Sequence, residues 1–223
     1  GLVIRIVNMS GWIMWVVTGI FENIGMVQDG LQTISQPVSV TDREQAKPLA
    51  VARGEVRFEH VDFHYGKKKG IIGDLNLTIK PGEKIGLIGP SGAGKSTLVN
   101  LLLRLYDVEG GRILIDGQNI AEVGQESLRA RIGMITQDTS LLHRSIRDNL
   151  LYGKPDATDA ELWEAVRKAR ADEFIPLLSD AEGRTGFDAH VGERGVKLSG
   201  GQRQRIAIAR VLLKDAPILI MDE

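Results

Sequence analysis

The residues with the clearest chemistry form a glycine-rich run, GPSGAGKST, at positions 89–97. Its three glycines allow backbone N–H groups to close around phosphate oxygens, because no Cβ stands in the way. Lys95 supplies a mobile positive charge for β- and γ-phosphates, and the Ser96 hydroxyl suits Mg²⁺. The run matches G-x-x-x-x-G-K-[ST] and predicts that the chain binds a nucleoside triphosphate. The residues expected at the phosphates are Gly89, Pro90, Ser91, Gly92, Ala93, Gly94, Lys95, Ser96 and Thr97.

Two carboxylates end a second apolar run, PILIMDE, at positions 217–223. The apolar residues predict a buried strand, and Asp222 at its end suits Mg²⁺, directly or through water, since hard cations take oxygen ligands. Glu223 lies one residue further on, so its side chain points to the other side of the strand. From there it can act as general base on the water that attacks the γ-phosphate. The pattern is weak alone and strong beside a phosphate-binding loop.

Two further groups can complete such a site. In LSGGQRQR, at positions 198–205, Ser199 and two glycines make an N–H-rich turn before an apolar helix, which is a second place for an anion. The same residue types are also ordinary helix caps. Gln137 follows an expected strand, where its amide can reach Mg²⁺ or the attacking water. A glutamine without such neighbours is usually only a surface amide.

The pattern of apolar residues predicts the elements that position these groups. The run at 85–88 predicts a strand leading into the glycine-rich loop, and leucines at 98, 101, 102 and 105 have helical spacing after it. Alternation predicts strands at 55–65, with a small slip, and at 75–79, and short strands are expected at 111–116 and 132–136. Beyond Pro155 the chain becomes helical, with a capping box from Thr158 and Glu161.

Composition excludes several classes of protein. A net charge of −1 over 223 residues gives no electrostatic reason to expect nucleic acid. Aromatic residues make up 5% of the chain, which argues against a base-stacking surface for nucleic acid. The lack of cysteine excludes a disulfide framework, a thiolate metal site and a cysteine nucleophile. The length leaves room for one large domain, or for one domain with an appendage.

The N-terminal segment differs chemically from the rest, since only Arg5, Glu22 and Asp29 are charged among residues 1–40. Residues 2–21 form a run of 20, long enough to span a bilayer as a helix at about 1.5 Å per residue. Trp12 and Trp15 lie in the middle of this run rather than at its edge. The composition leaves a membrane span, a buried helix and an interfacial helix open. Residues 36–54, with two prolines and a polar stretch, indicate a linker.

GPSGAGKST, ITQD, LSGGQRQR and ILIMDE, in this order, resemble the nucleotide-binding domain of an ATP-binding cassette (ABC) transporter. The likeness covers about residues 54–223 and is specific, because LSGGQ is the hallmark of that family. Lys95 and Ser199 are 104 residues apart (199 minus 95). That distance leaves room for a helical subdomain, but not for the long coiled coil of related chromosome-maintenance and DNA-repair ATPases. LLHRSIRDNLLYG and VGERG resemble exporters in particular, whose membrane and nucleotide domains share one chain.

The resemblance implies an α/β fold of the P-loop NTPase type, an ABC nucleotide-binding domain with a mixed sheet and a helical subdomain. It divides the chain into the last helix of a transmembrane domain (1–35), a linker (36–53) and the nucleotide-binding domain (54–223), truncated after the strand that carries Asp222. It also implies a protein of the cell membrane with this domain in the cytoplasm. The start at Gly1 and the end at Glu223 lead us to expect a segment of a longer protein.

In the family, two such domains face each other head to tail and trap ATP between them. By resemblance, ATP and Mg²⁺ are the cofactors, with Lys95, Gln137 and Glu223 in catalysis and Ser96, Gln137 and Asp222 on the metal. Tyr65 in FHYG then matches the adenine-stacking ring, although a core tyrosine is the alternative. The segment that closes over the partner's nucleotide consists of Ser199, Gly200, Gly201 and Gln202.

The partners that follow from the resemblance are a second half-transporter, the lipid bilayer and a transported small molecule, lipid or peptide, with no nucleic acid. Intact site motifs favour a homodimer over a heterodimer. Ala189 and His190 stand where exporters often carry Thr-Glu, so the coupling contact of that glutamate has no matching residue there. The family's switch histidine follows the catalytic glutamate, whereas all four histidines here precede Glu223. The segment alone is therefore expected to be inactive.

Three rival functions share part of this pattern. A soluble ABC ATPase that works on ribosomes or DNA would lack the apolar helix in front and would carry more basic charge. The detached ATPase subunit of an importer would begin close to Glu55 with its own methionine. A non-hydrolysing regulatory module would be expected to have lost Lys95, Asp222 or Glu223, and all three are present. The sequence does not specify the transported substrate.

Overall fold

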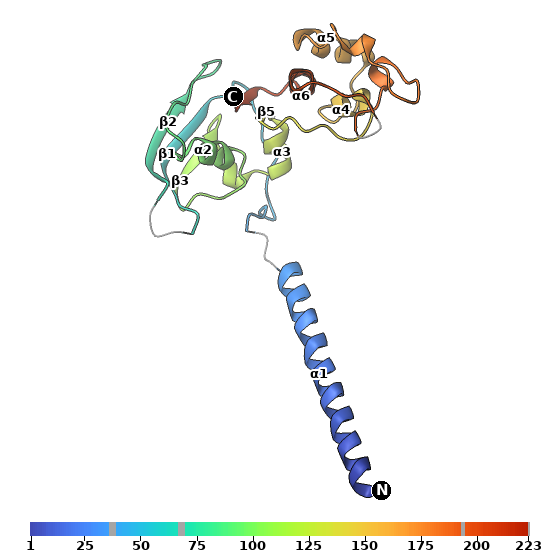
Figure 1. Cartoon of the computed structure of the whole chain (residues 1–223). Coiled ribbons are helices and arrows are strands. Elements are labelled where there is room, and N and C mark those ends of the chain that lie inside the picture. The colour runs from blue at the N-terminus through green and yellow to red at the C-terminus, as the bar shows by residue number, and fades with distance from the viewer. Residues whose placement is uncertain (36–38, 67–69, 193–194, 223) are drawn as a thin grey trace. The chain divides into compact units, whose positions relative to one another are not determined.

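The computed structural model describes residues 1–35, 39–66, 70–192 and 195–222. Contacts between residues divide the chain into two units, Gly1–Thr41 and Asp42–Glu223 (Figure 1). The first unit contains one helix, and the second contains the strands and the remaining helices. The proposed site residues that the structure describes all belong to the second unit.

Helix α1 (Leu2–Ile34) is continuous over 33 residues, so the helix expected at 1–35 is present. Two polar side chains bond back to carbonyls of the helix itself, Thr18 to Met14 at 2.9 Å and Asn23 to Gly19 at 2.7 Å. Among the residues that the structure describes, no helix combines the length and hydropathy that a membrane crossing requires. The membrane span expected here is not confirmed, because polar residues lower the mean hydropathy of the segment.

The second unit contains an antiparallel sheet with the strand order β2-β1-β3-β4. Its strands are β1 (Val56–Phe63), β2 (Ile72–Ile79), β3 (Gly110–Ile115) and β4 (Gln118–Asn119). The slip expected in β1 is real: the register shifts between Phe58 and Val61, and His60 has φ 49°. Gly111 (φ 73°) passes opposite this bulge, where a Cβ would lie 2.2 Å from the His60 oxygen. The bulge thus requires glycine at position 111.

A separate pair of parallel strands, β5 (Ile132–Ile135) and β6 (Ile218–Met221), runs in register from Ile132↔Ile218 to Ile135↔Met221. Both strands were predicted from the sequence. The expected burial of β6 is wrong in part, since Leu219 and Met221 are exposed. Among the described residues β6 pairs with β5 alone, so no strand pairs with its other edge.

The strand expected at 85–88 is absent. Residues 83–90 have no regular secondary structure, and Ile88 is 98% exposed. A strand needs a partner for its backbone N–H and C=O groups, and no described strand pairs with this segment. Apolar composition alone therefore gave the wrong prediction here.

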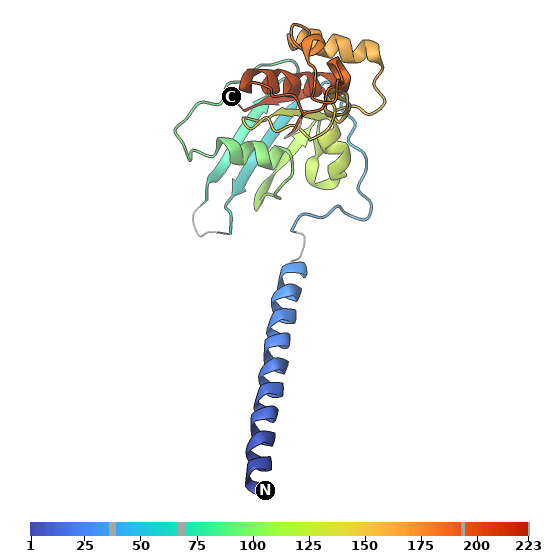
Figure 2. The ribbon, with the colours of Figure 1, turned by 45° about the vertical axis from the view of Figure 1, so that its right-hand side comes forward.

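Helices cover these strands and form a second core. They are α2 (Lys95–Leu102), α3 (Gln125–Ala130), α4 (Ile146–Leu151), α5 (Asp159–Lys168) and α6 (Gly200–Lys214), with short 3-10 turns η1 (Ile120–Glu122), η2 (Ile175–Leu177) and η3 (Gly186–Asp188). Helix α2 lies across the antiparallel sheet, with Leu101 in one core with Phe58 and Ile113 (Figure 2). Helices α4, α5 and α6 share the other core, which includes Leu150 and Ile206.

The predicted capping box begins α5. Thr158 N–H donates to the Glu161 carboxylate at 2.7 Å, and the Thr158 hydroxyl accepts from Glu161 N–H. Lys154 and then Thr158 donate to this carboxylate and lower the pKa of Glu161 to about 2. Trp163 of α5 lies with its ring centroid 4.6 Å from that of Phe187 and is 37% exposed, so it is only partly buried against the helical core. The helical part of the chain is therefore built much as its sequence predicts.

Candidate nucleotide-binding site

The glycine-rich loop leads into α2 through left-handed backbone at Gly92 (φ 82°) and Gly94 (φ 91°), which is the N-cap. Glycine adopts this conformation without a steric penalty, so the helix N–H groups stay free of side chains. The Lys95 ammonium donates to the carbonyl oxygens of Gly89 at 2.8 Å and Pro90 at 3.0 Å. The loop carbonyls thus hold the Lys95 ammonium beside the N-terminus of α2, an arrangement that fits phosphate oxygens.

The other end of α2 is anchored by Arg104, which is 3% exposed and has φ 49°. Its guanidinium donates to Asp107 at 2.9 Å, to the Val123 carbonyl at 3.0 Å and to Asp42 at 3.3 Å. Asp42 belongs to the segment predicted as a linker, so part of that segment is tied to the helix of the phosphate loop. Arg104 was not among the residues predicted from the sequence.

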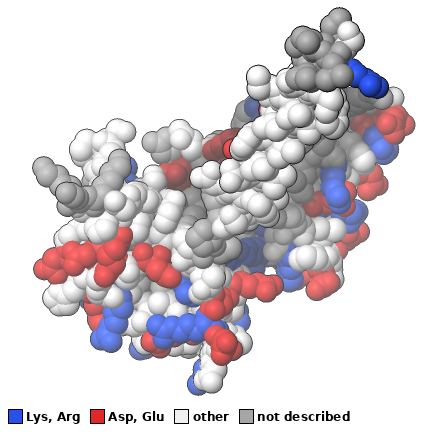
Figure 3. Space-filling view, turned by 90° about the horizontal axis from the view of Figure 1, so that it is seen from below, with Lys and Arg blue, Asp and Glu red and all other residues white. Residues whose placement is uncertain are grey.

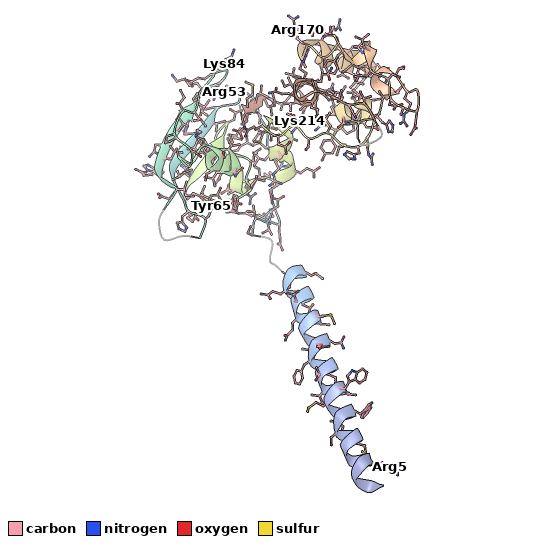
Figure 4. All side chains as sticks on the ribbon, in the orientation of Figure 1. Arg5, Arg53, Tyr65, Lys84, Arg170 and Lys214 are labelled. Atoms are coloured by element: carbon pink, nitrogen blue, oxygen red, sulfur yellow. The ribbon has the colours of Figure 1, made fainter. Side chains whose placement is uncertain are left out.

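Tyr65 lies beside the start of the same helix (labelled in Figure 4). Its hydroxyl donates to the Thr97 hydroxyl at 3.4 Å, which is a long hydrogen bond. The structure therefore brings together two of the predicted binding residues from strand β1's end and from α2. The ring remains 37% exposed, so it is not the fully buried core tyrosine of the alternative interpretation.

Gln137 and Asp222 follow the carboxyl ends of neighbouring parallel strands, β5 and β6. Asp222 N–H donates to the Ile135 carbonyl at 3.0 Å, which continues the strand pairing one residue beyond β6. Amide and carboxylate oxygens suit Mg²⁺. Ser96, the third predicted metal ligand, lies in the first turn of α2 instead, and its place beside the other two stays a prediction. Glu223 lies outside the described residues.

Ser199 is the N-cap of α6 and forms a reciprocal capping box. Its hydroxyl accepts from Gln202 N–H at 3.2 Å, and its own N–H donates to the Gln202 side chain at 2.8 Å. The interpretation of LSGGQ as a helix cap is therefore confirmed. The same geometry leaves the backbone N–H groups of Gly200 and Gly201 at the helix start, as an anion site would need. That second role stays a prediction.

Helix α6 is joined to the loop that follows Gln137. Arg210 donates to the Asn149 carbonyl at 2.7 Å and to its side-chain oxygen at 2.9 Å. The fully buried Asn149 amide donates to the carbonyls of Leu142 and Ser145, each at 3.0 Å, and its oxygen accepts from Leu142 N–H. Burial lowers the pKa of Arg210. Asn149 lies between buried apolar residues of α4, Ile146 and Leu150, which was the signal for this contact, and it was not predicted from the sequence.

The far end of α6 is fastened to β5. The Lys214 ammonium donates to the carbonyls of Arg129 at 2.6 Å and Ile132 at 2.8 Å (Figure 4). Glycine lets the helix approach, since a Cβ on Gly133 would lie 2.9 Å from Val211 and one on Gly153 would lie 2.3 Å from the Arg210 oxygen. The helix that starts at Ser199 is therefore attached to both the strand and the loop that flank Gln137.

These features define an α/β domain of the P-loop type, with a glycine-rich loop before α2, adjacent parallel strands followed by Gln137 and Asp222, and a second exposed helix start at Ser199. A family model described as "ABC transporter" matches residues 72–223. The chain belongs to the ABC transporter family. The predicted family and fold class are thereby confirmed.

Relatives agree with this assignment. An "Uncharacterized ABC transporter ATP-binding protein" of Haemophilus influenzae is 61% identical over 222 residues, which are 100% of this chain and 36% of the relative. A "Putative multidrug export ATP-binding/permease protein YgaD" of Bacillus subtilis is 45% identical over 220 residues, 98% of this chain and 36% of the relative. A solved bacterial Atm1-family ABC exporter with ATP bound matches at 43% identity and a TM-score of 0.80, covering 92% of this chain and 35% of that one. The chain thus spans about a third of the length of these proteins.

Proposed function

We propose that this chain provides ATP binding and hydrolysis for a dimeric exporter in the cell membrane. The observation that carries the proposal is the presence of two separate N–H-rich helix starts, one at Lys95 on the sheet core and one at Ser199 on the helical core. Each presents donors suited to one side of a triphosphate. Two chains in head-to-tail order would combine the loop of one with residues 199–202 of the other.

We assign the nucleotide contacts to the residues predicted from the sequence motifs, and the positions of the loop, Tyr65, Gln137 and Asp222 support this assignment. Residues 89–97 would hold the phosphates, and the partly exposed Tyr65 ring would stack on the base. Ser96, Gln137 and Asp222 would hold Mg²⁺, which neutralises charge on the β- and γ-oxygens when bound. Glu223 would take a proton from the attacking water. Lys95, now bonded to its own loop carbonyls, would exchange these for phosphate oxygens of higher negative charge.

The contacts of α6 indicate a route by which ATP binding would move other parts of the protein. A force on residues 199–202 from the partner's nucleotide would act on α6, because Ser199 caps that helix. Arg210 and Asn149 would pass the movement to Leu142 and Ser145, whose loop follows Gln137. Buried, fully bonded polar groups move together, since separating them leaves donors unsatisfied. We place the contact with the membrane domain in this loop region and around residues 191–195.

We assign residues 1–35 to the end of the last membrane helix, with the nucleotide-binding domain in the cytoplasm. The support is the row of exposed apolar side chains on α1, among them Trp12, Met14, Trp15 and Phe21. Neighbouring helices of a permease domain would cover such a surface, and a helix packed among others tolerates polar residues such as Ser10. A homodimer carrying a small molecule, lipid or peptide is the arrangement we favour.

On the face of the molecule shown in Figure 3, positively charged side chains (Lys and Arg) and negatively charged ones (Asp and Glu) are intermingled.

The test uses full-length protein purified in nanodiscs. Lys95→Ala and Ser199→Asp are each expected to lose ATPase activity, the first through its own nucleotide and the second through the partner's. Co-expression of the two, with a different affinity tag on each, should yield a mixed dimer with one intact site and partial activity. Lys84→Ala, an exposed lysine before the loop, is the matched control and should keep full activity. A mixed dimer without any activity would contradict a site shared between chains.

Membrane association has its own test. The full-length protein should remain in the pellet after alkaline extraction, as a protein embedded in the bilayer does. Release into the supernatant would contradict the exporter, while the ATPase results would still stand. The two experiments therefore separate the membrane assignment from the nucleotide site.

A further inference from the structure

Three aromatic rings, those of Phe63, Tyr65 and Tyr106, form a cluster between the end of β1 and helix α2. The Tyr65 ring centroid lies 4.8 Å from that of Phe63, at an interplanar angle of 84°. It lies 4.9 Å from that of Tyr106, at 85°. The third pair, Phe63 and Tyr106, is 5.7 Å apart and tilted by 53°. Edge-to-face pairs at these distances are attractive, because the positive ring edge meets the negative face.

We propose that Tyr106 is a positioning residue that sets the Tyr65 ring for stacking on the nucleotide base. The proposal rests on the function proposed above, in which Tyr65 contacts that base. Two T-shaped neighbours at nearly right angles restrict rotation of the Tyr65 ring from two directions. The bond from its hydroxyl to Thr97 holds the far end of the side chain. A ring held in advance loses less conformational freedom when a base binds.

The positions of the three rings in the chain fit this role. Phe63 is 3% exposed and belongs to the sheet core, so it fixes the cluster to the domain. Tyr106 follows the end of α2, the helix that begins at the phosphate loop. Tyr65 and Tyr106 are 37% and 40% exposed, which leaves part of both rings accessible to a ligand. The cluster thus relates the base-stacking ring to the helix that holds the phosphates.

The test compares the affinities of ATP and of inorganic tripolyphosphate for full-length protein in nanodiscs, both in the presence of Mg²⁺. Tripolyphosphate carries the phosphates without a base, so it does not report on Tyr65. Tyr106→Ala is expected to weaken ATP binding by about three- to tenfold, the usual range for an aromatic pair, and to leave tripolyphosphate binding unchanged. Tyr106→Phe keeps the ring and should restore the affinity for ATP. Tyr152→Ala, an exposed tyrosine outside this cluster, is the matched control.

The possible results distinguish the positioning role of Tyr106 from a structural role, and both from the base contact of Tyr65. Equal weakening of ATP and tripolyphosphate would give Tyr106 a merely structural role and would overturn the inference. Unchanged ATP affinity in Tyr106→Ala would also overturn it. Tyr65→Ala, measured in parallel, tests the underlying assignment: if it too leaves ATP affinity unchanged, the proposed base contact fails. If Tyr65→Ala weakens ATP while Tyr106→Ala does not, only the role of Tyr106 fails.

Discussion

The Arg210 guanidinium donates to both the backbone and the side-chain oxygen of Asn149, at 2.7 and 2.9 Å. This contact joins the helix that starts at Ser199 to the loop after Gln137. It is made from a buried asparagine and a partly buried arginine, so its strength does not depend on exposed charges. Helix α6 and the loop after Gln137 are therefore tied together within the domain.

Asn149→Ala should destabilise the protein and loosen this unit. The change removes the side-chain oxygen that accepts from both the Leu142 N–H and the Arg210 guanidinium, at a cost of about 1–3 kcal/mol. For a domain of this size, that corresponds to a midpoint of thermal unfolding lower by at least about 2 °C. Fluorescence-monitored melting of the full-length protein measures it. Asn76→Ala, whose bonds to Asp74 are exposed, is the control and should melt within about 1 °C of the wild type.

Ser199 has two proposed roles, and Ser199→Asp separates them. Aspartate is as good an N-cap as serine and interacts favourably with the helix dipole, so the thermal midpoint should stay at or above that of the wild type. Its carboxylate would repel the partner's γ-phosphate, so ATP turnover should fall more than about tenfold. Ser199→Ala should instead cost about 1 kcal/mol of stability through loss of the cap. Full ATPase activity in Ser199→Asp would leave Ser199 as a helix cap and nothing more.

Glu223→Gln should keep ATP binding and reduce turnover by about 100-fold or more, because the amide cannot accept the proton of the attacking water. Steady-state phosphate release and nucleotide titration, both on the full-length protein, measure the two effects separately. Glu126→Gln changes an exposed glutamate in the first turn of α3 and serves as the control. Unchanged phosphate release in Glu223→Gln would remove Glu223 from the role of general base.

Asp116 should make the stability of the domain depend on pH in the acid range. Its carboxylate accepts the backbone N–H groups of Ala52, Arg53, Gly54 and Glu55 at 2.8–3.1 Å. Burial raises the pKa of Asp116, but these bonds outweigh it and lower the pKa to about 2. A depressed pKa in the folded state gives stability that is present above the unfolded pKa of about 3.9 and is lost as the pH falls through about 2.

The variant Asp116→Asn should accordingly be less stable than the wild type at pH 7, with a difference that shrinks between about pH 4 and pH 2. Unfolding midpoints of the full-length protein at a series of pH values measure this difference. Asp156→Asn, in an exposed turn, should follow the wild type at every pH. A difference between Asp116→Asn and the wild type that stays constant across this range would show that the four bonds do not depend on the charge.

Short motifs predicted the local backbone structure around the candidate site. Glycines at 92 and 94, followed at once by Lys95, define the loop because its backbone conformation and charge are local properties. The same holds for Ser199 with Gln202, and for Thr158 with Glu161, since a capping box spans only four residues. Strands β1 and β2 were also predicted, because their alternation records which face is buried. In each case the residues that determine the structure are neighbours in the chain.

Tertiary structure alone decided the rest. The apolar run at 85–88 is not a strand in this structure, because pairing requires a partner that its own residues do not supply. Arg104 with Asp42, and Arg210 with Asn149, join segments 62 and 61 residues apart. The Tyr65 and Tyr106 rings likewise meet only after α2 has packed on the sheet. The sequence by itself determined the chemistry of the phosphate loop and the helix caps, because these depend on adjacent residues. The fold determined which distant side chains meet, because burial and hydrogen bonding between segments are settled only when the whole chain packs.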